Sequence, residues 1–298
     1  MDKKQQVGFI GLGAMGSLMA THLLSNGIEV HVYDIQSTLC NGIAEKGGIV
    51  HPHPKSVAEH SMVIICMLPN PSVVRSVILG ENGVLEGVKR ESVVIDMGTV
   101  GPSVEIECAE RLQEKGAHLI DAPVGKGVWA AGSGELTILA GGDKEIIASV
   151  EDILNMLGEK IIYCGPLGSG QVVKLSNNLA SCVNMAALSE LYVLAQKNGI
   201  DIDVIQEALN GTAADSWHLH NSLPRVKQDE FSPGFKTKLA HKDLELVVGL
   251  GEELGIDLPV SSNALSWYNN AIDKGYEDLD WSALAKAALE KVESKSVK

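Results

Sequence analysis

The sequence has few aromatic residues and no long apolar segment. It contains three phenylalanines, five tyrosines and four tryptophans among 298 residues. Its longest wholly apolar run, Met62 to Leu68, is far shorter than the roughly 20 residues that a membrane-spanning helix needs. The first four residues lead directly into a glycine-punctuated segment, without the apolar stretch of a signal peptide. We therefore expect a cytoplasmic protein with no membrane partner.

Cysteines are also few, and they are widely separated. Five are present, an odd number, and they form neither a Cys-x-x-Cys pair nor a cluster with histidine. Such a distribution is typical of reduced thiols in the core of an intracellular protein, so we expect no metal site. The five are Cys40, Cys66, Cys108, Cys164 and Cys182.

Positive charge is in deficit. The chain has 24 lysines and arginines against 38 aspartates and glutamates, which gives a formal net charge of −14. A protein that binds nucleic acid needs a basic face, so this balance argues against a nucleic-acid partner. With 45% hydrophobic and 21% charged residues, the composition is that of a folded globular protein. A length of 298 residues is typical of two domains.

The first half of the chain alternates short apolar runs with helical stretches. Continuous apolar strands separated by helices indicate an α/β domain with a largely parallel sheet covered on both faces. The predicted strands are 7–11, 29–34, 61–68, 92–96, 118–121, 136–140 and 160–164, with a helix over 14–26 after the first.

The pattern changes after the glycine-rich segment Gly165 to Gly170. Residues 171–197 form one long helical pattern that contains no proline or glycine. Further helical patterns follow near 203–210, 236–254, 260–274 and 281–292, and no good strand candidate remains. The sequence thus predicts an α/β domain over residues 1–165 and an all-α domain over residues 166–298.

A glycine motif follows the first predicted strand and opens the first predicted helix. Its first glycine allows a tight turn, its second lets backbone N–H groups approach a pyrophosphate, and its third lets the helix pack on the strand. The helix N-terminus adds partial positive charge for the phosphates. This G-x-G-x-x-G pattern predicts a dinucleotide-binding loop. It consists of Gly11, Leu12, Gly13, Ala14, Met15 and Gly16.

Asp34 ends the second predicted strand, close to the position roughly 20 residues after the motif where dinucleotide-binding domains carry an acidic residue. A carboxylate there accepts hydrogen bonds from the ribose hydroxyls and repels a 2′-phosphate. No arginine follows it, since the next residues are Ile35, Gln36 and Ser37. The sequence therefore favours NAD(H) over NADP(H).

Two further strand ends are candidates for the cofactor site. Ligands of open α/β sheets bind beyond the carboxyl ends of the strands. Leu68, Pro69 and Asn70 follow the third predicted strand, and Thr99 follows the fourth. Each segment either borders the cofactor, with Thr99 near the nicotinamide, or is a plain turn at a strand end. The residues alone leave both interpretations open.

Four motifs, in this order, resemble those of the β-hydroxyacid dehydrogenases, the 3-hydroxyisobutyrate dehydrogenase family. The resemblance covers nearly the whole chain. It implies a Rossmann-like domain joined by a long helix to an all-helical domain, and a homodimer or homotetramer. The motifs are Gly11 to Gly16 continuing to Met19-Ala20, Asp121-Ala122-Pro123-Val124, Gly168-Ser169-Gly170 with Lys174 and Asn177-Asn178, and Lys242-Asp243-Leu244.

Three residues take their expected roles from this resemblance. Lys174 matches the catalytic lysine, Asn178 matches the asparagine that orients the substrate, and Lys242 is expected near the nicotinamide. A spacing of four residues puts Lys174 and Asn178 on one helix face, where a lysine can protonate a forming alkoxide. Without the resemblance, a solvated polar helix face would be the simpler interpretation.

The segment that follows Asp121-Ala122-Pro123-Val124 departs from the family pattern. Family members usually continue with Ser-Gly-Gly, which holds the substrate carboxylate, whereas this chain has Gly125, Lys126 and Gly127. A fixed cation and two glycine amides suit a strongly charged anion. Lys126 is either a ligand of that anion or a loop lysine in solvent.

The 3-sulfolactaldehyde reductases are the subfamily that this segment resembles most, although they carry arginine where Lys126 stands. The preferred hypothesis is therefore an NADH-dependent 3-sulfolactaldehyde reductase in which Gly125, Lys126, Gly127 and Asn178 bind the substrate. A 3-hydroxyisobutyrate dehydrogenase and a tartronate or succinic semialdehyde reductase remain alternatives. In every case the substrate is a small anionic aldehyde or hydroxyacid.

Three other functions fit the residues less well. A non-catalytic dinucleotide-binding module is disfavoured because Lys174 is present. Imine reductases resemble this pattern, but they replace that lysine and usually prefer NADP. 6-Phosphogluconate dehydrogenase has a much longer helical domain.

Overall fold

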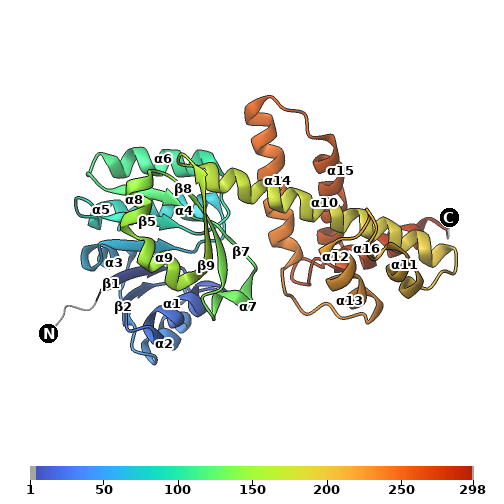
Figure 1. The fold of residues 1–298 in the computed structure, drawn as a ribbon, viewed down its shortest axis with the longest axis horizontal. Coiled ribbons are helices and arrows are strands. Elements are labelled where there is room, and N and C mark those ends of the chain that lie inside the picture. Colours follow the sequence, from blue (N-terminus) through green and yellow to red (C-terminus); the bar gives the residue numbers. More distant parts are fainter. Residues whose placement is uncertain (1–4, 297–298) are drawn as a thin grey trace. The chain divides into compact units, whose positions relative to one another are not determined.

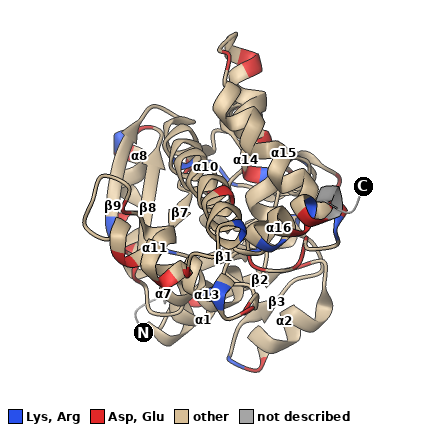
Figure 2. Cartoon of the chain, turned by 90° about the vertical axis from the view of Figure 1, so that its right-hand side faces the viewer, with Lys and Arg blue, Asp and Glu red and all other residues tan. Residues whose placement is uncertain are grey.

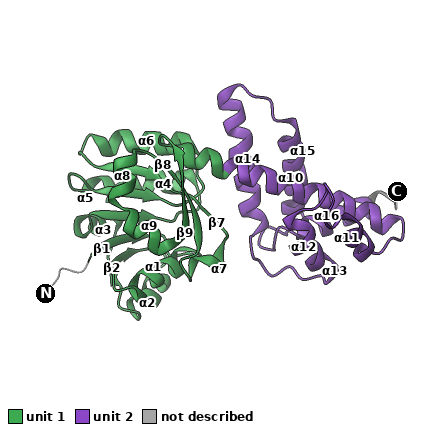
Figure 3. Cartoon of the chain, viewed as in Figure 1, with its two compact units in different colours: residues 1–174 green, residues 175–298 purple. Residues whose placement is uncertain are grey.

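The structure, a computed structural model, describes residues 5–296, with side chains up to residue 293. Residues 1–4, on which the expected absence of a signal peptide rests, lie outside the described residues. The chain divides into two compact units, Met1–Lys174 and Leu175–Lys298 (Figure 3). The division falls inside helix α10 (Ser169–Lys197), because the first turn of that helix is bonded to the sheet. A domain boundary at residue 165 therefore stays a prediction.

Unit 1 is built on one nine-stranded sheet (Figure 1). Its strands are β1 (Gln6–Ile10), β2 (Glu29–Tyr33), β3 (Ile49–Val50), β4 (Val63–Cys66), β5 (Val93–Asp96), β6 (His118–Asp121), β7 (Val124–Gly125), β8 (Leu136–Gly141) and β9 (Gly158–Gly165). Their order is β3-β2-β1-β4-β5-β6-β8-β7, with β9 beside β8. The run from β3 to β6 is parallel, whereas β8 is antiparallel to β6 and β7. The predicted, largely parallel sheet is confirmed.

Helices cover both faces of this sheet. Helices α1, α2, α7, α8 and α9 pack on one face, and α3 to α6 pack on the other. Strand β1 sends Val7 and Phe9 into the first core and Ile10 into the second, as the alternation of side chains along a strand requires. The helices are α1 (Gly16–Ser25), α2 (Ser37–Ala44), α3 (Pro54–His60), α4 (Pro71–Leu79), α5 (Val84–Gly87), α6 (Pro102–Gln113), α7 (Val128–Ala131), α8 (Lys144–Ser149) and α9 (Glu151–Leu157).

The regular secondary structure of unit 2 consists of helices in its described residues, apart from one isolated bridge between Lys236 and Asp280. This confirms the predicted all-α region. Its core surrounds Tyr268, which is fully buried and donates a hydrogen bond to the Cys182 carbonyl oxygen at 3.3 Å. Besides the rest of α10, its helices are α11 (Ile202–Leu209), α12 (Trp217–Asn221), α13 (Leu223–Lys227), α14 (Thr237–Leu254), α15 (Pro259–Asp273) and α16 (Ala283–Ser296).

Among the described residues, α10 alone has the length and the apolar composition of a membrane-crossing helix. The core helix of a globular protein meets the same two criteria. Leu175, Cys182 and Met185 of α10 are buried in the core of unit 2, as a core helix requires. Acidic and basic residues are interspersed over the helices that face the viewer in Figure 2.

Three histidine rings lie together beside β2. The ring centroids of His31 and His51 are 5.1 Å apart, and those of His51 and His60 are 4.8 Å apart. His31 Nδ1 and His51 Nε2 share a hydrogen bond of 2.9 Å. Burial lowers the pKa of His51 to about 4, and the charges of His31 and His60 lower it further. Burial also lowers the pKa of His31. His31 and His51 are therefore neutral in the folded protein near pH 7.

We predict that this cluster makes the fold sensitive to acid. In the unfolded chain His51 takes up a proton near its ordinary pKa of 6.5, whereas in the folded protein it does so only near pH 4. The unfolded state therefore binds more protons between these values, so the stability of the fold decreases as the pH drops from 6.5 to 4. The free energy of unfolding, measured in urea from pH 7 to pH 4.5, should depend less on pH in His51→Gln than in the wild type. His118→Gln, which alters a partly exposed histidine of the same sheet, is the control. Equal pH dependence of His51→Gln and the wild type would contradict the prediction.

Candidate active site

The glycine loop joins β1 to α1 and packs against the residues that follow β4. Gly11 has a φ of +95°, and a Cβ atom on it would lie 2.4 Å from the Met67 carbonyl oxygen. A Cβ atom on Gly16 would lie 1.9 Å from the Gly11 carbonyl oxygen, so α1 begins directly against the turn. At Gly13 the corresponding position is open. The loop thus combines a tight turn with an accessible backbone, which fits the pyrophosphate of a dinucleotide.

The predicted strand-end residues reach the same edge of the sheet. Strand β1 lies between β2 and β4, and the order of the strands reverses there, which is where open α/β sheets bind ligands. Leu68, Pro69 and Asn70 follow β4 after Met67, and Thr99 follows β5. The side chain of Asn70 caps α4, since its Oδ1 accepts the Val73 N–H at 2.9 Å. Asn70 therefore has a structural role at this edge as well.

Asp34 braces the glycine loop. Its Oδ2 atom accepts the Leu12 N–H at 2.7 Å, and its Oδ1 atom accepts the Gln36 N–H at 2.8 Å. A carboxylate has about four acceptor positions, so both oxygens can still accept from ribose hydroxyls. Ile35 beside it is 88% exposed. The residue predicted to select the cofactor is thus half-buried and held in place by the loop that it serves.

Asn178, Asp243 and Lys242 form a chain of polar contacts within unit 2. Asn178 is buried, and its Nδ2 atom donates to Asp243 Oδ2 at 2.6 Å. The other carboxylate oxygen of Asp243 pairs with Lys242 Nζ at 2.7 Å. Asn177 donates to Asn178 Oδ1 at 3.0 Å. These contacts fix the orientation of the Asn178 amide and bring two of the predicted site residues together through Asp243.

Lys174 is half-buried and lies four residues before Asn178 on α10. The backbone that carries it starts at a buried carboxylate. Asp121, at the end of β6, accepts the Gly168 N–H at 2.7 Å and the Gln171 N–H at 2.8 Å, each with a different oxygen. The first turn of α10 is therefore bonded to the carboxyl edge of the sheet.

The buried side chain of Gln171 continues this connection. Its Oε1 atom accepts the backbone N–H groups of Val100 and Gly101 at 3.0 and 3.2 Å. Its Nε2 atom donates to the Gly98 carbonyl oxygen at 3.1 Å and to Glu105 Oε1 at 2.8 Å. All four hydrogen-bonding positions of the amide are used. One side chain thereby joins α10, α6 and the segment around Thr99.

Burial raises the pKa of Glu105 well above its ordinary value of 4.5, and the nearby carboxylates of Asp96 and Asp121 raise it further. Burial also raises the pKa of Asp121, although its hydrogen bonds from backbone N–H groups oppose this. The surroundings of Glu105 therefore favour its neutral, protonated form. Neither Glu105 nor Gln171 was among the predicted site residues. The sequence feature that could have identified Glu105 is its position among Val104, Cys108 and Leu112, on the apolar face of α6.

The segment that departs from the family pattern lies at the edge of the sheet. Gly125 pairs with Thr137 in β7 and β8, and a Cβ atom on it would be 3.7 Å from the Thr137 Cβ, an ordinary contact. Lys126 has a φ of +77°, which is uncommon for a residue with a side chain, and Gly127 follows at +80°. Lys126 Nζ forms an ion pair with Glu159 in β9. The described side chains thus engage Lys126 with an acidic partner.

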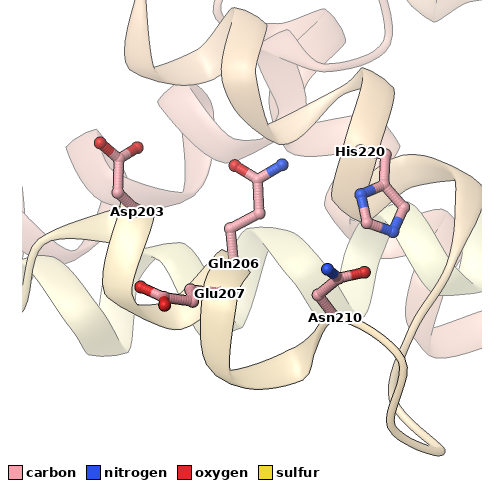
Figure 4. A pocket seen from close by; sticks show the side chains of 5 residues that line it. All are labelled: Asp203, Gln206, Glu207, Asn210 and His220. Atoms are coloured by element: carbon pink, nitrogen blue, oxygen red, sulfur yellow. The ribbon is translucent and has the colours of Figure 1, made fainter.

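A surface depression of about 320 Å³ in unit 2 contains none of the predicted site residues (Figure 4). All the residues that line it have polar or charged side chains. Within the described part of the chain, no group of three His, Cys, Asp or Glu side chains is arranged to hold a metal ion. The depression is lined by Asp203, Gln206, Glu207, Asn210 and His220.

Comparisons with known proteins agree with this geometry. Residues 6–165 match the NAD binding domain of 6-phosphogluconate dehydrogenase, and residues 168–288 match the NAD-binding region of NADP-dependent 3-hydroxyisobutyrate dehydrogenase. The uncharacterized oxidoreductase YkwC of Bacillus subtilis is 37% identical, over 95% of this chain and 98% of the relative. The 3-sulfolactaldehyde reductase of Escherichia coli is 36% identical, over 93% of this chain and 94% of the relative. A solved 3-hydroxyisobutyrate dehydrogenase of Mycobacterium tuberculosis with L-serine has a TM-score of 0.88 at 30% identity and covers 95% of this chain and 99% of its own.

We predict that Asp34 sets the preference for NADH over NADPH. Asp34→Asn removes the charge that repels a 2′-phosphate, so the ratio of the two dissociation constants should shift by about tenfold or more toward NADPH. Asp34→Ala should cause the same shift and should also weaken NADH binding, since the Leu12 N–H loses its acceptor. Cofactor fluorescence titration measures both constants. An unchanged ratio in both variants would show that Asp34 does not read the ribose.

We also predict that protonated Glu105 makes the fold sensitive to alkali. Above pH 4.5 the unfolded chain releases this proton while the folded protein retains it, so the stability of the wild type falls as the pH rises toward the raised pKa. Glu105→Gln has no such proton. Its free energy of unfolding should therefore rise relative to that of the wild type as the pH increases from 5 to 9. Glu107→Gln, which removes an exposed carboxylate of the same helix, is the control. A constant difference between Glu105→Gln and the wild type across this range would refute the prediction.

Proposed function

We propose that this chain, which belongs to the 3-hydroxyisobutyrate dehydrogenase family, reduces a short anionic aldehyde with Lys174 as the general acid. The family assignment makes it an NAD(H)-dependent oxidoreductase that acts on CH–OH groups. The substrate is a small hydroxyacid or the corresponding semialdehyde. The identity of that substrate and the roles of individual residues are our proposal.

The observation that carries the proposal is the position of Lys174 on α10. It lies three residues after Gln171, whose backbone and side chain are bonded to the sheet that carries the glycine loop. Asn178 follows one turn later, with its amide oriented by Asp243. An ammonium group and an amide on adjacent turns of a well-anchored helix can hold a carbonyl oxygen and its neighbouring group.

The glycine loop and the strand ends are the proposed cofactor site. When bound, NADH supplies the hydride that reduces the carbonyl carbon. The loop holds the pyrophosphate and Asp34 holds the ribose, while the other residues border the nicotinamide side. The proposed cofactor residues are Gly11, Leu12, Gly13, Ala14, Met15, Gly16, Asp34, Leu68, Pro69, Asn70, Thr99 and Lys242.

Lys174 stabilises the negative charge that develops on the carbonyl oxygen and then donates a proton to it. The products are the alcohol and a neutral lysine, which regains its proton from water. In the opposite direction the neutral amine accepts the proton of the substrate hydroxyl. Asn178 orients the substrate for either direction.

We propose 3-sulfolactaldehyde as the first candidate substrate. Gly125, Lys126 and Gly127 offer one cation and accessible backbone amides to a sulfonate. For Lys126 to take part, its ion pair with Glu159 must exchange for the substrate anion. The second candidate substrate is 3-hydroxyisobutyrate or the corresponding semialdehyde, each of which carries a carboxylate in place of the sulfonate. The similarity to a solved 3-hydroxyisobutyrate dehydrogenase supports it, although Gly125 stands where that family usually has serine.

We further propose a cytoplasmic homodimer or homotetramer, as the family resemblance implies. All five cysteines are free thiols, which suits a reducing compartment. Leu194 of unit 2 is 68% exposed beside a shallow apolar depression, which suits a contact with a second copy. The depression is lined by Glu190, Val193, Leu194, Lys197, Trp267 and Val292.

Lys174→Ala should lower kcat by about 100-fold or more, because the reaction loses its proton donor. The dissociation constant of NADH should change by no more than about threefold, since the glycine loop is untouched. Lys115→Ala, which removes an exposed lysine just after α6, should leave both quantities unchanged. A fully active Lys174→Ala variant would remove this residue from the chemistry.

A panel of aldehydes tests the substrate assignment. The wild type should show its highest kcat/KM with 3-sulfolactaldehyde, compared with the semialdehydes of methylmalonate, tartronate and succinate. Lys126→Ala should lower that value by about tenfold, since a charged hydrogen bond to the anion is lost. Lys160→Ala, which removes an exposed lysine from β9, is the matched control. A clear preference for a carboxylate semialdehyde, with no effect of Lys126→Ala, would reject the sulfonate.

A further inference from the structure

We propose that Asp121, Gln171 and Glu105 are positioning residues for the reaction, because together they fix the backbone from which Lys174 extends. We name these three residues the α10 anchor. The proposal rests on the proposed role of Lys174 as the general acid. It assigns a function to two residues, Glu105 and Gln171, that no sequence motif singled out.

Asp121 fixes where α10 begins. The first N–H groups of a helix have no partners within the helix, and the Asp121 carboxylate accepts two N–H groups at this end, from Gly168 and Gln171. The surroundings leave little freedom. A Cβ atom on Gly141 would lie 2.3 Å from Asp121 Oδ1, and one on Gly170 would lie 2.7 Å from Asp121 Oδ2. The start of the helix therefore has one position relative to β6.

Gln171 fixes the rotation of α10 about its axis. Its four side-chain hydrogen bonds reach the backbone of residues 98–101 and the carboxyl group of Glu105. Because hydrogen bonds are directional, this set allows one orientation of the first turn. Lys174 lies three residues later, on a neighbouring part of the same helix face. The segment around Thr99, a proposed cofactor contact, is held by the same side chain.

Glu105 completes the anchor as a neutral group. In its protonated form it accepts from Gln171 Nε2 and still carries a proton of its own to donate. An ionised Glu105 would bring a further charge among the buried carboxylates of Asp96 and Asp121. Glutamine has the same shape and the same neutral donor and acceptor. Alanine has neither. A comparison of Glu105→Gln with Glu105→Ala therefore distinguishes the effect of losing the hydrogen bond from the effect of losing the carboxyl group.

Stability alone is a weak explanation for such an anchor. Replacing both partners of a buried hydrogen bond by apolar groups of the same shape is often nearly neutral or even stabilising. What a directional polar network adds is a defined geometry. In an active site a displacement of about 1 Å can cost roughly 100-fold in rate.

The experiment compares Gln171→Leu, Glu105→Ala and Glu105→Gln in the full chain. Rates are measured with NADH and whichever panel aldehyde the wild type reduces fastest. We expect kcat to fall by 10- to 100-fold in Gln171→Leu and Glu105→Ala. The dissociation constant of NADH should stay within about threefold of the wild type. Glu105→Gln should restore kcat to within about threefold of the wild type.

Cys108→Ala is the matched control for loss of stability. Cys108 lies on α6 one turn after Glu105 and is equally buried. This variant should lower the melting temperature while leaving kcat unchanged. If Gln171→Leu does not fold, the comparison between Glu105→Ala and Glu105→Gln decides the question. The proposal is overturned if Glu105→Ala and Gln171→Leu both keep the wild-type kcat. It is also overturned if Cys108→Ala lowers kcat as much as these variants do when it lowers the melting temperature.

Lys174→Ala separates this proposal from the proposed function. An inactive Lys174→Ala variant with a fully active Gln171→Leu variant would reject the α10 anchor alone. A fully active Lys174→Ala variant would reject the proposed function, and the anchor would fall with it. A wild type that reduces no aldehyde of the panel would have the same consequence.

Discussion

A single buried carboxylate, that of Asp121, holds the start of α10 to the sheet. The strand β6 ends at this residue, and its two oxygens accept two backbone N–H groups from the segment that begins the helix. The position of the Lys174 backbone therefore depends on how firmly this first turn of α10 is held. The compact unit that contains the sheet extends to Lys174, beyond the end of β9.

Asp34, which follows β2, accepts backbone hydrogen bonds in the same way. There too a carboxylate at the end of a parallel strand accepts two backbone N–H groups, one from the glycine loop and one from the chain that follows the strand. In both places an acidic residue at a strand end fixes the backbone of a neighbouring segment. Substitutions at Asp34 and Asp121 therefore act on geometry as well as on charge.

Local features were predictable from the sequence, and long-range partners were not. The glycine motif, the parallel strands and the long helix follow from spacings of a few residues. The strands β3 and β7 have two residues each, too few for a pattern. Gln171 meets Glu105 across 66 positions of the chain, and Lys126 meets Glu159 across 33. Such contacts depend on the order of the strands, which local patterning does not determine.

Hydrogen exchange of the backbone amides at the start of α10 tests the central claim most directly. The Gly168 and Gln171 amides of the wild type should exchange about as slowly as those in the middle of β6, although helix ends usually exchange rapidly. In Asp121→Asn one acceptor oxygen becomes a donor group, so at least one of the two amides should exchange much faster while those of β1 stay protected. Rapid exchange of both amides in the wild type would contradict the account, because the helix that carries Lys174 would then have no fixed start.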